Sequence, residues 1–212
     1  MTFEYKLDGE IYTVLVVKKR NKNTYIKIKD DLTIYVTTNY LATKYYVKNI
    51  LDNEKDFLRK SLNKVKKHAE MDSEFYYLGQ KYDIILLPFQ IMKIEDGKIY
   101  VQDLKVLDKW LKNETINIFS ERLTYNYNLF NEKIPFPKLK IRKMKTRWGV
   151  CNKRDNSITL NSNLIKYSLK EIDYVIVHEL SHFVHFDHSK EFWKTVATYM
   201  PLYKESVKVL KG

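Results

Sequence analysis

Residues 175–193 read VIVHELSHFVHFDHSKEFW, and this stretch holds four of the chain's five histidines. Apolar residues recur through it and through the residues before it at the spacing of an amphipathic helix. A helix would place His178 and His182, four residues apart, on one face. Glu179, the residue after His178, would lie next to that face. The H-E-x-x-H spacing therefore predicts a helix whose two imidazoles bind one metal ion.

Both ends of this helix carry local signals. Ser168 and Glu171 have capping-box spacing, so we predict that the helix begins near Leu169. Asp187 to Ser189 resembles a turn, and Ser189 is placed to cap a second helix. A bend at this turn would return His188 to the first two histidines as a third ligand.

Three imidazoles and one open position are typical of a catalytic zinc site, and zinc lowers the pKa of a bound water from about 15.7 to roughly 7. Glu179 would act as the general base. The competing interpretation is a histidine pair on a solvated surface. The apolar residues before the motif instead indicate a buried helix, where imidazoles need partners. His185 is a weaker candidate ligand that is expected to pack beside the site or face solvent, and His68 is expected at the surface.

Composition limits the class of protein. With 212 residues, 44% hydrophobic and 30% charged, the chain is expected to form one domain or two small ones. We find no apolar run long enough for a membrane span and no secretory signal, and the single cysteine, Cys151, allows no internal disulfide. These features favour a cytoplasmic protein. The net charge of +12 is compatible with nucleotides, nucleic acid or an acidic substrate, but the lysines are spread along the chain and favour a solvated surface.

The element pattern predicts an α+β fold in two parts. Asp-Gly pairs at residues 8–9 and 96–97 mark hairpins. Residues 1–102 are expected to form an antiparallel β-rich part with an inserted helical segment at 39–71. In residues 103–212, the expected catalytic part, the elements are a helix at 103–130, strands at 138–144, 147–151 and 157–160, and the helices of the metal site and the C-terminus.

Several motifs make the chain resemble the YgjP-like metallopeptidase family, which is related to WLM and SprT-like zinc metalloproteins. They are K-T-R-W-G at 145–149, I-T-L-N at 158–161, and H-E-L-x-H followed after five residues by H-S-x-x-F-W. The resemblance implies a Zn²⁺ cofactor held by His178, His182 and His188, with Glu179 as base. It also implies a peptide or protein substrate and a zincin-like, gluzincin-type helix packed on a small sheet.

The resemblance also suggests Arg147 and Trp148 as substrate-binding residues at the border of a cleft. Two positions depart from related patterns. Val150 stands where the family usually has serine, and His185 stands where metzincins have glycine. Oligomeric state cannot be inferred from the sequence.

Two other functions remain open. The same site with a basic surface is compatible with a metal-dependent nucleotide phosphohydrolase, although the chain has no Gly-rich phosphate loop. A nucleic-acid-associated zinc protein is the third possibility, and it predicts DNA binding that weakens steeply with salt.

Overall fold

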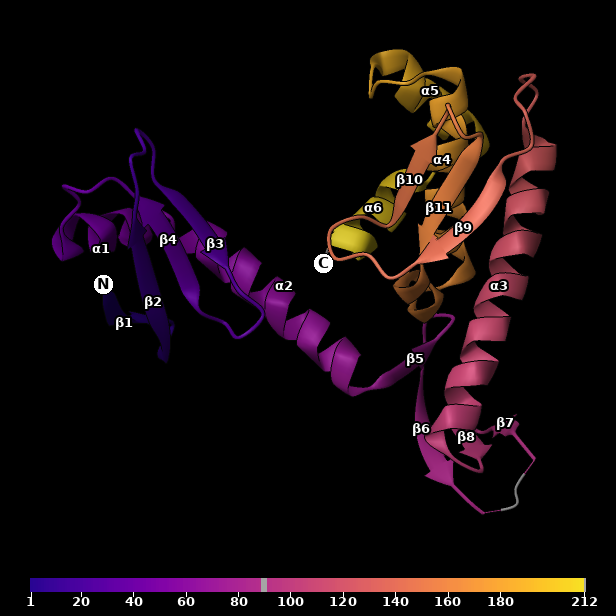
Figure 1. Ribbon diagram of the computed structural model, residues 1–212, viewed down its shortest axis with the longest axis horizontal. Helices are drawn as coiled ribbons and strands as arrows, with labels where there is room; N and C mark the ends of the chain where they lie inside the picture. Colours follow the sequence, from indigo (N-terminus) through magenta and orange to yellow (C-terminus); the bar gives the residue numbers. More distant parts are fainter. Residues whose placement is uncertain (89–90, 212) are drawn as a thin grey trace. The chain divides into compact units, whose positions relative to one another are not determined.

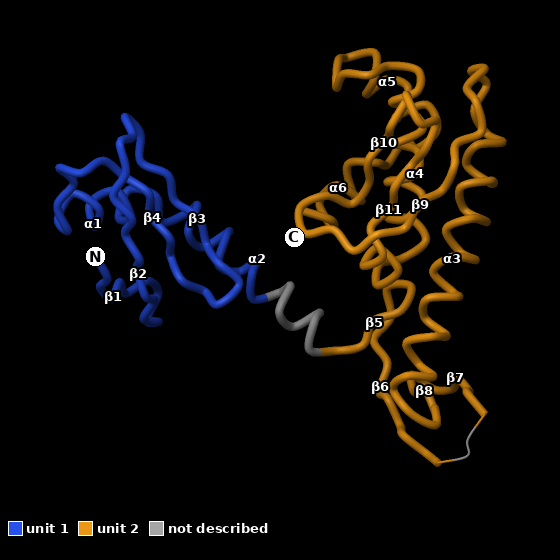
Figure 2. The backbone as a smooth tube through the Cα atoms, viewed as in Figure 1, with its two compact units in different colours: residues 1–73 blue, residues 74–212 orange. Residues whose placement is uncertain are grey.

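A computed structural model describes residues 1–88 and 91–211, with the backbone alone for residues 67–73 (Figure 1). The side chain of His68 therefore lies outside the described part. The protein is a mixed α+β chain, as predicted, and divides into two compact units, residues 1–73 and 74–212 (Figure 2). The functional division at residues 102 and 103 stays a prediction.

The first unit is a four-stranded sheet with two helices. Its strands are β1 (Thr2–Leu7), β2 (Glu10–Lys18), β3 (Tyr25–Ile28) and β4 (Ile34–Thr38), and its helices are α1 (Lys44–Asn53) and α2 (Lys55–Ser73). Alternate residues of β1 are buried, and they share one core with apolar residues of both helices. The predicted Asp8-Gly9 hairpin joins β1 and β2.

The prediction of an antiparallel sheet is wrong for one pair of strands in this unit. The strand order is β1-β2-β4-β3, and β2 pairs with β4 in parallel. Strand β4 inserts between β2 and β3 and is antiparallel to β3. The connection through residues 19–24 therefore takes the chain past the position that β4 later fills.

The second unit begins with a small sheet and a long helix. The sheet contains β5 (Phe75–Tyr77), β6 (Gln80–Leu86), β7 (Lys93–Glu95) and β8 (Lys98–Val101), in the order β5-β6-β8-β7. The helix is α3 (Leu104–Leu129), and the carboxylate of Asp103 caps it by accepting from the backbone N–H groups of Lys105 and Val106 at 2.7 and 2.9 Å.

The remaining elements surround one buried helix. They are β9 (Lys138–Arg142), β10 (Gly149–Asn152), β11 (Ser157–Asn161), the 3-10 turn η1 (Ser162–Lys166), α4 (Leu169–Val184), α5 (Lys190–Tyr199) and α6 (Tyr203–Lys211). Strand β11 lies between β10, its antiparallel partner, and β9, its parallel partner. Helix α4 packs against β10, β11, α3, α5 and α6, so it is the central element of the second unit (Figure 1).

Polar contacts fix α4 from two directions. Arg122 of α3 donates to both carboxylate oxygens of Asp173 at 2.7 and 2.6 Å, and Asn126 donates to the same carboxylate at 2.8 Å. At the start of α4, the Leu78-Gly79 turn donates two backbone N–H groups to carbonyls of η1. Gly79 has a φ of 82°, and a Cβ there would lie 3.1 Å from the Cβ of Ser168, so glycine permits this close approach.

None of the described helices combines the length and the apolar character needed to span a bilayer.

Candidate metal centre

Helix α4 begins at Leu169, as the sequence predicts, but the contacts at its start differ from a capping box. Ser168 caps no backbone N–H with its side chain. Its hydroxyl instead donates to the carboxylate of Glu171, which also accepts from Ser206 of α6 at 3.3 Å. The serine and glutamate therefore connect the helix start to the C-terminal helix.

The predicted turn follows the helix and returns the chain to it. Helix α4 ends at Val184, and the N–H of His185 donates to the Ser181 carbonyl at 2.9 Å. Ser189 then caps α5 by accepting from the N–H of Phe192 at 3.4 Å. His188 lies between these two helix ends, on the segment that bends back.

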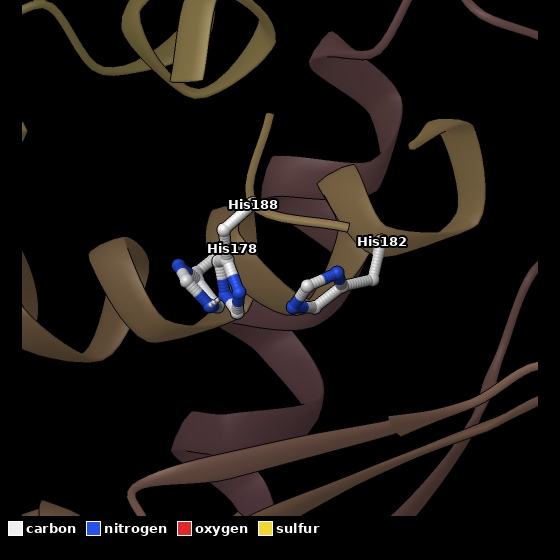
Figure 3. Close-up of side chains that lie close together, drawn as sticks. All are labelled: His178, His182 and His188. Carbon is white, nitrogen blue, oxygen red and sulfur yellow. Dashed lines mark hydrogen bonds between the residues drawn. The ribbon is translucent and has the colours of Figure 1, made fainter. Parts of the chain in front are cut away.

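The structure brings His178, His182 and His188 together (Figure 3). Their candidate ligand atoms all lie within 4.8 Å of one another, and Nε2 of His178 is 3.1 Å from Nε2 of His188. His185 does not belong to this cluster. Its carbonyl oxygen lies 3.4 Å from Nδ1 of His182, which leaves Nε2 of His182 available to the other two rings.

Phe192 contacts all three imidazoles. Its fully buried ring lies 4.9, 4.6 and 4.8 Å from the ring centroids of His178, His182 and His188. Trp193 flanks His178 and His188 at 5.7 and 5.8 Å. The cluster therefore rests on aromatic side chains at the start of α5.

The histidines of α4 are held in the neutral form. Burial, together with the neighbouring His182 and His188, lowers the pKa of His178 to about 3. Burial and His188 also lower the pKa of His182. Neutral imidazoles keep a lone pair on one nitrogen, which is the form that binds a metal ion.

Glu179 is buried beside the cluster, and strand β10 shapes its pocket. Burial raises the pKa of Glu179 to about 8, while a hydrogen bond from the backbone N–H of Cys151 and the guanidinium of Arg147 act in the opposite direction. A Cβ on Gly149 would lie 2.5 Å from Oε1 of Glu179, a separation shorter than any real contact. Glycine at residue 149 therefore leaves the space that the carboxylate fills.

The two predicted substrate-binding residues have different surroundings. Arg147 is exposed, lies two residues before β10, and is close enough to Glu179 to act on its charge. Trp148 is half-buried, donates its indole N–H to the Leu210 carbonyl at 3.2 Å and packs edge-on against Tyr167. These are packing contacts with α6 and with the end of η1, and the substrate-binding role of Trp148 stays a prediction.

Sequence reasoning missed the part of the site that comes from the sheet. Gly149 and the N–H of Cys151 contact Glu179 across 28 to 30 positions of sequence, and no local spacing signals this. Phe192 was recognisable as an apolar residue in the first turn of the helix that Ser189 is placed to cap. The Cys151 thiol itself is a poor ligand candidate, because burial raises its pKa to about 12.

The donor set fits a metal ion. Three imidazoles converge, and burial desolvates two of them, His178 and His182. A solvated surface pair does not explain the desolvation of His178 and His182, whereas a metal ion bound by the converging nitrogens would give both rings a polar partner.

Comparisons with known proteins give two solved structures and one family model. The chain is similar to the crystal structures of two metallopeptidase zymogens, abylysin of Pyrococcus abyssi and jannalysin of Methanocaldococcus jannaschii. The match to abylysin has 24% sequence identity and a TM-score of 0.40, and it covers 43% of this chain and 90% of the abylysin chain. The match to jannalysin has 22% sequence identity and a TM-score of 0.36, and it covers 46% of this chain and 94% of the jannalysin chain.

No curated protein gives a significant match to the sequence. A family model described as the YgjP-like metallopeptidase domain matches residues 22–212, which is most of both compact units. The chain therefore belongs to the YgjP-like metallopeptidase family.

Proposed function

We propose that this protein is a zinc-dependent metallopeptidase of the H-E-x-x-H type, with the zincin-like arrangement of an active helix on a small sheet. The observation that carries the proposal is the convergence of His178, His182 and His188 beside the buried carboxyl of Glu179. Family membership supports a catalytic metal ion and a peptide bond as the target.

Zinc is the metal that this donor set favours. Imidazole nitrogens suit Zn²⁺, and the cluster offers three imidazoles and no carboxylate. Magnesium and calcium prefer oxygen ligands, so they fit poorly here. Three protein ligands leave a fourth position open, which distinguishes a catalytic site from a closed structural one.

Glu179 is proposed as the general base and, later, the general acid. Zinc, when bound, makes a water molecule nucleophilic at neutral pH and polarises the carbonyl under attack. Glu179 accepts the proton of the attacking water and returns it to the amine that leaves. A nearby cation favours the carboxylate form, so occupation of the site would lower the raised pKa of Glu179.

The sheet supports this role by fixing the carboxylate. The Cys151 N–H donates to it, and Gly149 leaves room for it against β10. A carboxylate held by a hydrogen bond and by steric contact loses few alternative rotamers when the reaction begins, which lowers the cost of orientation.

Metal analysis and peptide hydrolysis test the proposal together. Protein purified without added metal and then reconstituted should hold one zinc per chain. His188→Ala should lose or weaken the zinc, whereas His185→Ala, a histidine outside the cluster, should keep it. Glu179→Gln should keep the zinc and lose turnover on a peptide library.

Two results would reject the proposal. One is a wild-type protein that holds no zinc after reconstitution, which would make the histidines structural. The other is a zinc-loaded Glu179→Gln variant with full activity. A nucleoside triphosphate panel run beside the peptides would show metal-dependent phosphate release if the phosphohydrolase alternative were correct.

A further inference from the structure

One strongly basic run of the chain lies beside the candidate active site. In residues 138–147, six of ten residues are lysine or arginine and none is acidic. Lys140 pairs with Asp155 across the sheet, but the described part of the chain offers Arg147 no ion pair. Arg147 is exposed, and it is two residues from Gly149, whose position abuts the Glu179 carboxyl.

A second cation lies at the other end of β10. Lys153 directly follows this strand, and its Nζ lies 5.7 Å from the centroid of the Phe186 ring. That ring is 71% exposed and lies 6.4 Å from the ring of His182. Lys153 also has no ion pair within the described residues, and its charge acts on His182.

The loop before β10 is held rigidly. The buried amide of Asn161 donates to the carbonyls of Met144 and Arg147 at 2.8 and 2.9 Å, and its oxygen accepts from the N–H groups of Met144 and Asn163 at 3.2 and 3.1 Å. All four hydrogen-bonding positions of the amide are occupied. The backbone of Arg147 is therefore fixed, although its side chain reaches solvent.

We propose that Arg147 and Lys153 select peptide substrates with acidic side chains on both sides of the scissile bond. The inference rests on the proposed peptidase function and adds the chemistry of its substrate. The two cations border the site from opposite ends of β10, and neither has an ion pair among the described residues. An acidic side chain of a substrate would therefore displace no ion pair known for either cation.

The spacing of the cations favours a peptide over a nucleotide. Residues 147 and 153 are six positions apart around strand β10, so at roughly 3.3 Å per residue their backbones are separated by up to about 20 Å. An extended peptide can place two acidic residues across this distance. One triphosphate is too short to reach both cations, and the chain lacks a Gly-rich loop to cradle phosphates.

Binding to an inactive variant tests the proposal without turnover. Zinc-loaded Glu179→Gln protein would be titrated with three fluorescent peptides that share one central sequence and carry Glu, Gln or Lys residues on both flanks. We expect the Glu-flanked peptide to bind about fivefold to tenfold more tightly than the Gln-flanked one, since an exposed ion pair contributes modestly. The preference should shrink in high salt, because salt screens exposed charges.

Charge substitutions then assign the preference to the two residues. Arg147→Gln and Lys153→Gln, each in the Glu179→Gln protein, should each reduce the preference by about threefold. The double charge reversal Arg147→Glu with Lys153→Glu should favour the Lys-flanked peptide. Lys105→Gln is the matched control, because this exposed lysine of α3 lies outside the site and its loss changes the net charge equally.

The outcomes separate this proposal from the proposed function. If wild-type enzyme cleaves peptides but the three peptides bind equally, or Lys105→Gln has the same effect as the site variants, the acidic preference is overturned and the peptidase stands. If no peptide is cleaved or bound, both fail. Binding of a nucleoside triphosphate in place of every peptide would also overturn the acidic-peptide assignment.

Discussion

Glycine at residue 149 is a point of close approach between strand β10 and helix α4. The absence of a side chain there lets the Glu179 carboxyl lie against β10, and a Cβ would come within 2.5 Å of Oε1 and 2.7 Å of Cγ. We predict that Gly149→Ala displaces the carboxylate and lowers kcat/KM by about tenfold to a hundredfold, because small misplacements of a catalytic group are that costly. Steady-state peptide hydrolysis with zinc-loaded protein measures the loss.

A double variant distinguishes this role from a general loss of fold. Gly149→Ala combined with Glu179→Gln should be no less active than Glu179→Gln alone, since both changes remove the same interaction. The zinc content of Gly149→Ala should stay at one per chain. Additive losses, or a loss of zinc, would mean that residue 149 acts on something other than the glutamate.

At this scale, local spacing predicted only part of the candidate site. The H-E-x-x-H pattern placed His178, Glu179 and His182 because one helix carries all three, and the turn residues around His188 indicated that the chain bends back. The contributions of Gly149, in β10, and of Lys153, directly after it, depend on the tertiary packing of this strand against α4. No periodicity in a single sequence encodes such contacts.

Among the elements, helices α3 and α4 share one largely buried ion pair, between Arg122 and Asp173. The side chains of Arg122 and Asp173 are 17% and 19% exposed. Asp173→Ala would remove both carboxylate contacts and leave the largely buried guanidinium of Arg122 without a counter-ion. We therefore predict that the free energy of unfolding falls by about 3 kcal/mol. Urea denaturation measures the change.

The matched control replaces both charges. Arg122→Met with Asp173→Leu removes the pair and leaves no charge unpaired, so it should recover most of the lost stability. If Asp173→Ala unfolds at the same urea concentration as wild type, the pair is not what joins the two helices.

Element types and most boundaries followed from the sequence, while strand pairing did not. The predicted helix at 103–130 is α3, and the Asp8-Gly9 and Asp96-Gly97 turns join paired strands. Turn chemistry fixes such hairpins locally. The parallel pairs β2 with β4, β6 with β8 and β9 with β11 arise where a later strand pairs with one that is not its hairpin partner, and this choice depends on the whole sheet.

At the scale of the whole molecule, the two compact units differ in what they carry. The three candidate ligands and Glu179 all belong to residues 74–212, and so do all three tryptophans, Trp110, Trp148 and Trp193. Tryptophan fluorescence therefore follows the unfolding of the second unit alone. This allows the stability of the unit with the site to be measured in the full chain.

The raised pKa of Glu179 predicts how that stability varies with pH in metal-free protein. The pKa of Glu179 rises from an ordinary value of 4.5 to about 8, so between these values the folded state binds more protons than the unfolded state. Its contribution is complete below pH 4.5 and is lost as pH rises through 8. His178, whose pKa falls from 6.5 to about 3, acts in the opposite direction, but only below pH 6.5.

Between pH 6.5 and 8 the Glu179 contribution is therefore not offset by His178. We expect the free energy of unfolding to fall by up to about 1.4 kcal/mol per pH unit in this window. Glu179→Gln cannot titrate and should lose this slope, which urea titrations followed by tryptophan fluorescence at pH 6.5, 7.2 and 8 would reveal. Equal slopes in the two proteins would contradict this prediction. They would show that burial does not keep the Glu179 carboxyl protonated in the metal-free protein.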